Sequence, residues 1–190
     1  MSKESPKLIL ASASPRRKQL LALAGLSFTV EAANVPEEVP EGMPLEAQSE
    51  YLALLKAGAV KAFHPADVVL GSDTTVACEG RLLGKPATPE EAREMLHLLS
   101  GRTHTVYTGV AILGPKSQES FTSATEVEFY ELTEEEIEAY VASGEPMDKA
   151  GAYGIQGTGC RFVKGIRGDY FTVVGLPLAE VVRKTEALLK

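Results

Sequence analysis

Residues 67–78 read Asp67-Val-Val-Leu-Gly-Ser-Asp73-Thr-Thr-Val-Ala-Cys78. The apolar residues on both sides of the polar centre predict one long buried strand. A carboxylate inside such a strand is costly unless it is paired or binds a metal ion, so Asp73 is a candidate base or metal ligand. The alternative is a buried aspartate that accepts bonds from backbone amides. Gly71 leaves room for the close approach of a backbone or a ligand.

Helices and strands alternate on both sides of this segment. Apolar and β-branched runs predict further strands at residues 7–11, 28–32, 103–113 and 120–130. Helices are expected after Pro15, at residues 45–63, from Thr88 to Leu99, from Thr133 to Ser143 and after Pro177. Hairpin turns are also indicated, so the sheet should be mixed and the fold class α/β.

Three of these helices carry start signals. Ser14 is expected as the N-cap of the first helix, because Pro15 suits the first helical position. Thr88 and Thr133 are each followed three residues later by glutamate, the pattern of a capping box.

The length and composition are those of a soluble globular protein. The 190 residues fit one domain or two small lobes that share a core, and 44% are hydrophobic. No stretch approaches the roughly 18 apolar residues of a membrane span. The polar residues 1–7 do not resemble a signal peptide. Cys78 and Cys160 are expected to be reduced, partly buried residues of a cytosolic protein.

The net charge is −7, which argues against broad binding to nucleic acid or to an anionic membrane. The acidic excess is local, because residues 126–138 contain seven glutamates and no lysine or arginine. The rest of the chain has equal numbers of acidic and basic residues. A basic pocket for a small polyanion is therefore compatible with the composition, and the acidic segment is expected to face solvent.

The segment Ser12-Ala-Ser-Pro-Arg16-Arg17 is a strand-to-helix turn. Free backbone N–H groups at such a turn suit a phosphate group. Two arginines in the first helical turn oppose the helix dipole, at a cost of ~0.3–1 kcal/mol each. We expect an anion to offset this cost, either a triphosphate bound by the guanidinium groups or nearby glutamates.

Lys56 falls among apolar positions of the helix expected at residues 45–63. At 100° per residue it lies on the same face as Leu52 and Phe63. A lysine on an inner face needs an anionic partner, or its side chain must extend to the edge of the helix.

Two later segments could contact a ligand. Lys85, in Gly84-Lys85-Pro86, could reach a phosphate from a rigid turn, although a solvated lysine fits equally. Residues 151–159 contain four glycines, which allow backbone donors to approach a ligand. Gln156 carries both a donor and an acceptor, as recognition of a base edge requires. The alternative is an ordinary glycine-rich turn.

Together these segments resemble the Maf family of nucleoside triphosphate pyrophosphatases. The matching segments, in order along nearly the whole chain, are 10–17, 71–74, 84–86, 99–102, 148–157, 168–170 and 174–178. No one segment is decisive, but the set is highly specific.

The resemblance implies an α/β fold in one Maf-like domain over residues 1–190. In this fold a long twisted mixed sheet is flanked by helices, and two lobes surround a cleft, as in the inosine triphosphate pyrophosphatases. It also implies metal-dependent hydrolysis, with Mg²⁺ or Mn²⁺, of a nucleoside triphosphate to its monophosphate and pyrophosphate. A cytoplasmic house-cleaning enzyme is expected, with no nucleic-acid or membrane partner, and the family suggests a homodimer.

Within the family, Arg16, Thr74 and Gln156 match the positions that mark the branch acting on dTTP and UTP. The resemblance implies that Asp73 is the catalytic base, that Lys85 assists catalysis at a phosphate, and that Thr74 and Gln156 bind the pyrimidine. Ser12, Arg16, Arg17 and Lys56 are then assigned to substrate binding, with the three cationic side chains at the phosphate groups.

A loop glutamate of the family also helps to hold the metal ion, together with Asp73. It falls on Glu37, but Pro36 stands where the family usually has an acidic residue. Glu38 is therefore the alternative ligand.

Two other functions are compatible with these residues. One is a nucleotide-sensing regulator of cell division without catalysis, against which the intact Asp73, Lys85 and Gln156 argue. The other is a pyrophosphatase for a modified purine nucleotide.

Overall fold

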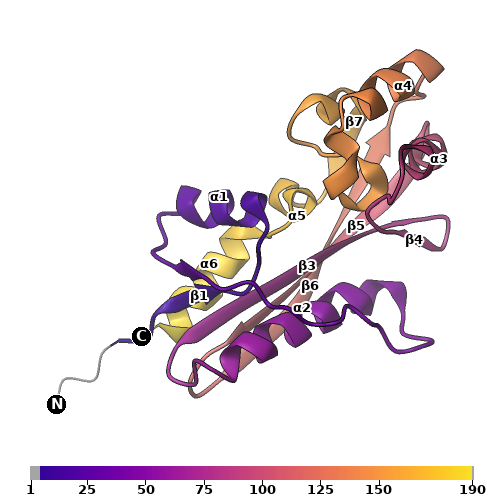
Figure 1. Ribbon diagram of the computed structural model, residues 1–190. Coiled ribbons are helices and arrows are strands. Elements are labelled where there is room, and N and C mark those ends of the chain that lie inside the picture. Colours follow the sequence, from indigo (N-terminus) through magenta and orange to yellow (C-terminus); the bar gives the residue numbers. More distant parts are fainter. Residues whose placement is uncertain (1–4, 190) are drawn as a thin grey trace. The chain divides into compact units, whose positions relative to one another are not determined.

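A computed structural model describes residues 5–189 of the chain. The chain forms two compact units. The first contains the chain up to Asp73, Thr108–Ser123 and the chain from Gly175 onward; the second contains Thr74–Tyr107 and Ala124–Val174. Figure 1 gives the positions of the helices and strands along the chain.

The described residues form one mixed sheet of seven strands. The strands are β1 (Leu8–Leu10), β2 (Thr29–Val30), β3 (Val68–Cys78), β4 (Arg81–Leu83), β5 (Thr103–Leu113), β6 (Gln118–Phe129) and β7 (Val163–Arg167). Their order is β2-β1-β3-β5-β6-β7, with β4 also paired to β3. Strand β1 is parallel to β2 and β3, whereas the pairs β3–β4 and β6–β7 are antiparallel. The predicted mixed α/β sheet is thus confirmed.

The α-helices are α1 (Pro15–Leu23), α2 (Leu45–Lys61), α3 (Pro89–Leu99), α4 (Glu134–Ala142), α5 (Tyr170–Val174) and α6 (Leu178–Leu188). Three 3₁₀ turns are η1 (Glu145–Asp148), η2 (Ala150–Ala152) and η3 (Thr158–Phe162). No helix among residues 5–189 combines the length and the apolar character that a membrane crossing needs.

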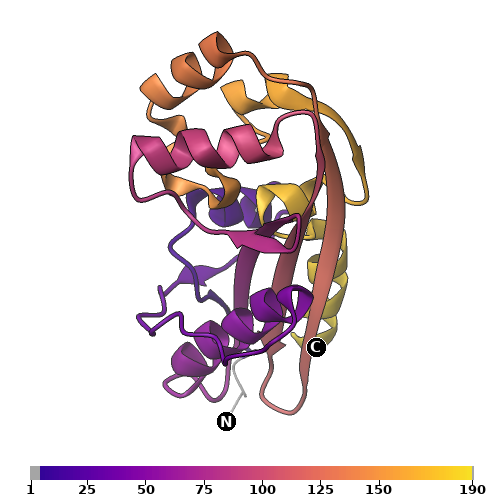
Figure 2. The ribbon, with the colours of Figure 1, turned by 90° about the vertical axis from the view of Figure 1, so that its right-hand side faces the viewer.

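In the first unit, α2 packs tightly on β3 and β5, and α6 lies on the other side of these strands (Figures 1 and 2). A Cβ atom at Gly71 would lie 2.4 Å from the carbonyl oxygen of Ala53, and one at Gly109 would lie 2.1 Å from the backbone nitrogen of Glu50. Both glycines are therefore required for the helix to approach the sheet. The space that Gly71 leaves is occupied by the α2 backbone.

The core under α2 follows the alternation of the strands. Ile9 and Val69 point toward the helix, and the residues next to each of them along its own strand point to the opposite face. The buried members of this cluster are Ile9, Ala11, Ala53, Ala57, Val60, Val69, Ala111 and Leu113. This packing sets the register in which α2 lies on β3.

In the second unit, α3 and α4 lie side by side (Figure 2). Arg93 of α3 bridges to Glu138 of α4 through two hydrogen bonds of 2.5 and 3.1 Å. Thr133 and Glu136 form the complete capping box predicted for α4. Thr88 caps α3 as predicted by accepting a bond from the Glu91 backbone nitrogen, but the Glu91 carboxylate bonds to Ala87 instead of closing the box.

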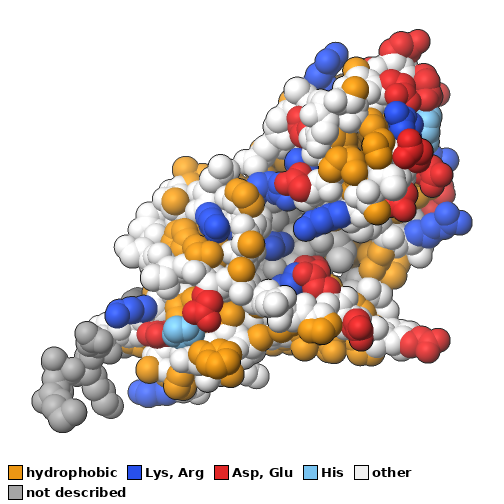
Figure 3. Space-filling model, viewed as in Figure 1, with side chains coloured by type: hydrophobic (Ala, Val, Ile, Leu, Met, Phe, Trp, Pro, Cys, Tyr) orange, Lys and Arg blue, Asp and Glu red, His pale blue; other side chains and the backbone are white. Residues whose placement is uncertain are grey.

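The acidic segment faces solvent, as predicted. Figure 3 shows acidic side chains gathered over the part of the second unit that carries α3 and α4. Several are paired with nearby basic residues, namely Glu126 with Arg167, Glu128 with Lys164, Glu134 with His97 and Glu138 with Arg93. These partners come from other parts of the sequence, so the composition of residues 126–138 alone could not predict the pairs.

Two expectations about local structure were wrong in detail, one was confirmed in position only, and one strand was missed. Helix α2 ends at Lys61, so Phe63 lies beyond the helical repeat and is 79% exposed. Ser14 occupies the N-cap position of α1 but makes no side-chain cap bond. Cys160 is exposed, whereas Cys78 is buried. The strand β7 was not predicted, because its five residues are mostly exposed and lack an apolar run.

Candidate active site

An ion-paired group of three side chains lies in the first unit. The Nζ atom of Lys56 is 2.6 Å from Oδ1 of Asp73 and 2.9 Å from Oε1 of Glu37. The side chains of Lys56 and Asp73 are each 12% exposed, whereas that of Glu37 is 59% exposed. Lys56 therefore has the anionic partner that an inner-face lysine requires, and Asp73 is paired as a buried carboxylate must be.

The packing of α2 explains this pairing. Asp73 follows Gly71 by two residues, so both point to the α2 face of β3. Lys56 directly precedes Ala57, whose backbone nitrogen lies 2.9 Å from the place that a Cβ on Gly71 would occupy. The close approach at Gly71 thus brings the lysine over the aspartate.

Ser12 and Arg17 form a second part of the first unit's site. Nη1 of Arg17 donates to Oγ of Ser12 at 3.2 Å, and its Nε donates to the carbonyl oxygen of Gly175 at 2.9 Å. The Ser72 hydroxyl donates to the same carbonyl at 3.2 Å. Gly175 was not predicted as a site residue, and its positive φ of 126° is a conformation that favours glycine.

The charged residues of the first unit affect one another. Burial lowers the pKa of the Arg17 guanidinium below its ordinary value, and the charge of Arg16 acts in the same direction. The charges of Asp73 and Glu37 act against this shift. Arg16, Glu37 and Asp73 are therefore each close enough to Arg17 for their charges to act on it.

In the second unit, the Lys85 turn lies beside the glycine-rich segment. The carbonyl oxygen of Gly84 accepts a hydrogen bond of 3.0 Å from the backbone nitrogen of Gly151. Lys85 and Gln156 are both exposed, and Pro86 between the strand and α3 is buried. These two segments, far apart in sequence, are thus held together within the unit.

Thr74 is the first residue of the second unit and directly follows Asp73 in β3. Strand alternation turns its side chain to the face opposite Asp73. It is partly buried.

The carboxylates of Glu37 and Asp73 are the oxygen donors available for a metal ion in the first unit's site. Both lie within hydrogen-bond distance of one atom, Lys56 Nζ, so they surround a common position for a positive charge. Among residues 5–189 there is no group of three or more His, Cys, Asp or Glu side chains that could hold a metal. Two carboxylates fit a hard ion that takes its remaining ligands from water and phosphate oxygens. Of the two candidate loop glutamates, Glu37 is the one that contacts Lys56.

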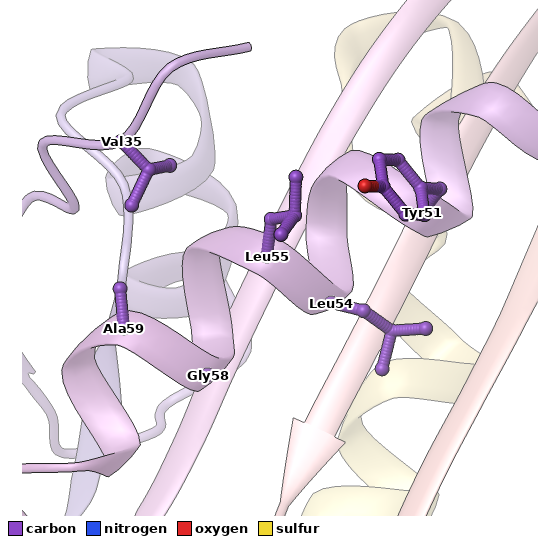
Figure 4. A pocket seen from close by; sticks show the side chains of 6 residues that line it. All are labelled: Val35, Tyr51, Leu54, Leu55, Gly58 and Ala59. Atoms are coloured by element: carbon purple, nitrogen blue, oxygen red, sulfur yellow. The ribbon is translucent and has the colours of Figure 1, made fainter. Parts of the chain in front are cut away.

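An apolar hollow of about 490 Å³ lies beside α2 (Figure 4). Its lining residues are Val35, Tyr51, Leu54, Leu55, Gly58 and Ala59. None of them is charged, so this hollow does not fit a triphosphate.

Comparison with known proteins identifies the family. The family model described as "Maf-like protein" matches residues 7–188. A protein of Moorella thermoacetica named dTTP/UTP pyrophosphatase is 59% identical over 177 residues, which cover 92% of this chain and 91% of that protein. Proteins with the same name from Geobacillus sp. (strain WCH70) and Bacillus cereus (strain B4264) are each 54% identical, covering 96% and 94% of this chain and 98% and 93% of theirs.

Solved structures are more distantly similar. A nucleoside-triphosphatase / dITP/XTP pyrophosphatase from Mycobacterium abscessus is 16% identical with a TM-score of 0.46, and the match covers 96% of each chain. The family model and the close relatives each span nearly the whole sequence, so this chain belongs to the Maf-like protein family.

Proposed function

We propose that this chain hydrolyses dTTP and UTP between the α and β phosphates, releasing the monophosphate and pyrophosphate. The observation that carries the proposal is the Glu37–Lys56–Asp73 group, which combines a candidate base with a phosphate-binding cation. The pyrimidine nucleotides follow from relatives of 54–59% identity that are named dTTP/UTP pyrophosphatase.

Hydrolysis of a phosphoanhydride depends mainly on a positioned water molecule and on neutralised phosphate charge. We assign the neutralisation to Arg16, Arg17 and Lys56, because fixed cations can bind phosphate oxygens directly. Ser12, which accepts a bond from Arg17, adds a hydroxyl in the turn before α1. Lys85, on its exposed turn in the second unit, is assigned to a phosphate oxygen.

Asp73 is assigned as the base that orients the attacking water and accepts its proton. The water oxygen forms a bond to the α-phosphorus, the bond from that phosphorus to the bridging oxygen breaks, and pyrophosphate leaves. We propose that Glu37 and Asp73 hold Mg²⁺ or Mn²⁺. Such an ion neutralises phosphate charge and lowers the pKa of a bound water molecule. Lys56 then exchanges its two carboxylate partners for phosphate oxygens.

The free cysteines Cys78 and Cys160 fit a reducing compartment, so we place the enzyme in the cytoplasm. The family match over residues 7–188 supports treating both units as one functional domain. A homodimer stays a prediction from the family resemblance.

The test of the function is a panel of nucleoside triphosphates assayed for pyrophosphate release with and without Mg²⁺ or Mn²⁺. We expect dTTP and UTP to be cleaved at least about tenfold more efficiently than purine nucleotides, because a site that pairs with a pyrimidine edge leaves polar groups unpaired against a purine. Release of pyrophosphate rather than orthophosphate would confirm cleavage between the α and β phosphates. Binding without turnover would support a regulator, and preference for a modified purine would support the other alternative.

Replacing Gln156 with alanine should weaken this base preference. We expect the ratio of kcat/KM for dTTP to that for GTP to fall about tenfold or more, because the amide pairs with the pyrimidine edge. The matched control is Gln118→Ala, since Gln118 is an exposed residue at the start of β6. If Gln156→Ala keeps the pyrimidine preference, Gln156 does not recognise the base.

A further inference from the structure

The Glu145 carboxylate accepts four hydrogen bonds within the second unit. Its Oε2 accepts from the backbone nitrogen and the hydroxyl of Thr158, at 3.2 and 2.6 Å. Its Oε1 accepts from the backbone nitrogen of Gly159 at 3.3 Å and from the Tyr140 hydroxyl at 3.1 Å. An ionised carboxylate can accept about four hydrogen bonds, so every acceptor position of this side chain is occupied.

Tyr140 extends the contact to the other end of the same loop. Its hydroxyl oxygen accepts a hydrogen bond of 3.1 Å from the backbone nitrogen of Gly154. Glu145 and Tyr140 therefore hold both ends of residues 154–159, the segment that carries Gln156. We call this segment the Gln156 loop.

Gly157 and Gly159 of the Gln156 loop leave the space that the side chains of Glu145 and Tyr140 occupy. A Cβ at Gly157 would lie 2.7 Å from Oε1 of Glu145, and one at Gly159 would lie 2.7 Å from the Tyr140 hydroxyl. The amides of Gly154 and Gly159 point to these two side chains. The expectation that these glycines expose backbone donors to a ligand was therefore wrong for these positions, because the donors are already used.

The protonation states suit this arrangement. Burial by itself would raise the pKa of Glu145, but the hydrogen bonds from Thr158, Gly159 and Tyr140 outweigh it and lower the pKa below its ordinary value. Burial raises the pKa of Tyr140. At neutral pH the carboxylate is thus ionised and the tyrosine hydroxyl keeps its proton as a donor.

We propose that Glu145 is a positioning residue for recognition of the nucleobase. Its carboxylate, together with the Tyr140 hydroxyl, fixes the Gln156 loop and so places the Gln156 amide. This inference rests on the proposed function, in which Gln156 pairs with the pyrimidine.

The variant Glu145→Gln tests this role because glutamine keeps the size but replaces one acceptor oxygen with a donor. That NH₂ group cannot accept from Thr158 or Gly159, so the loop loses at least one anchor. Lys149 binds the backbone oxygen of Glu145, and this contact stays intact in the variant. The turn η1 should therefore remain folded.

Two measurements give separate readouts. Amide hydrogen exchange in residues 154–159 should become about tenfold faster in Glu145→Gln, while exchange in α3 stays unchanged. The kcat/KM ratio of dTTP over GTP should fall about tenfold, mainly through a higher KM for dTTP. A loss of folded protein would instead lower the rates for all substrates in parallel.

Matched variants sharpen the comparison. Glu135→Gln changes an exposed glutamate of α4 and should alter neither readout. Tyr140→Phe removes one hydroxyl and should speed exchange at Gly154 more than at Thr158. Thr158→Val removes one donor and should add little to the effect of Glu145→Gln, because both break the same bond.

The outcomes are distinct. Unchanged exchange in Glu145→Gln overturns the anchoring of the loop, and faster exchange with unchanged base selectivity overturns the positioning role. If the parent protein shows no preference for dTTP and UTP, the proposed function itself fails, whatever the variant does.

Discussion

Asp73→Asn is expected to lower the rate of pyrophosphate release from dTTP by about 10³-fold, within the range of 10²–10⁴ for loss of a general base. Asparagine has nearly the same shape, but its amide cannot take up the proton of the attacking water. It is also a weaker ligand for a divalent ion. Lys56 keeps Glu37 as a partner in this variant, since that contact is separate from Asp73.

The control for this variant is Asp67→Asn. Asp67 immediately precedes the same strand and accepts a hydrogen bond from the backbone nitrogen of Lys7, away from the Lys56 pair. Thermal unfolding of both variants checks that the fold is kept. Wild-type turnover in a folded Asp73→Asn protein would contradict the assignment of the base.

The sequence identified both members of the buried ion pair, each for its own reason. Asp73 was selected because it interrupts an apolar strand, and Lys56 because it lies on an inner helix face. Their pairing could not be predicted, because it depends on the register of α2 on β3. That register depends on the backbone contacts at Gly71 and Gly109. These contacts join segments that are distant in sequence and form only when the chain folds.

Local signals predicted most elements of the fold. Alternation and apolar runs located the long strands, and the threonine caps located the starts of α3 and α4. The Gln156 loop was harder, because its anchor Glu145 lies outside the glycine-rich segment. A single glutamate next to glycines resembles any solvated residue, and its four bonds form only when the loop closes around it.

Lys56→Gln should lower the turnover of dTTP by about 10²-fold, because one fixed cation at the transferring phosphate is lost. The same change should destabilise the metal-free protein, since Glu37 and Asp73 lose their shared positive charge. We expect the loss to be smaller than the roughly 3–5 kcal/mol of a fully buried pair. The reason is that Glu37 is 59% exposed and keeps much of its hydration.

Metal ions should act differently on this variant and on the parent protein. In the parent, the Lys56 ammonium competes with a divalent ion for the two carboxylates, whereas in Lys56→Gln it does not. Mn²⁺ should therefore raise the Tm of the variant more than that of the parent. Lys116→Gln, at an exposed turn between β5 and β6, serves as the control and should behave like the parent. Equal stabilisation by Mn²⁺ in both proteins would show that Glu37 and Asp73 are not its ligands, and full turnover in Lys56→Gln would remove Lys56 from phosphate binding.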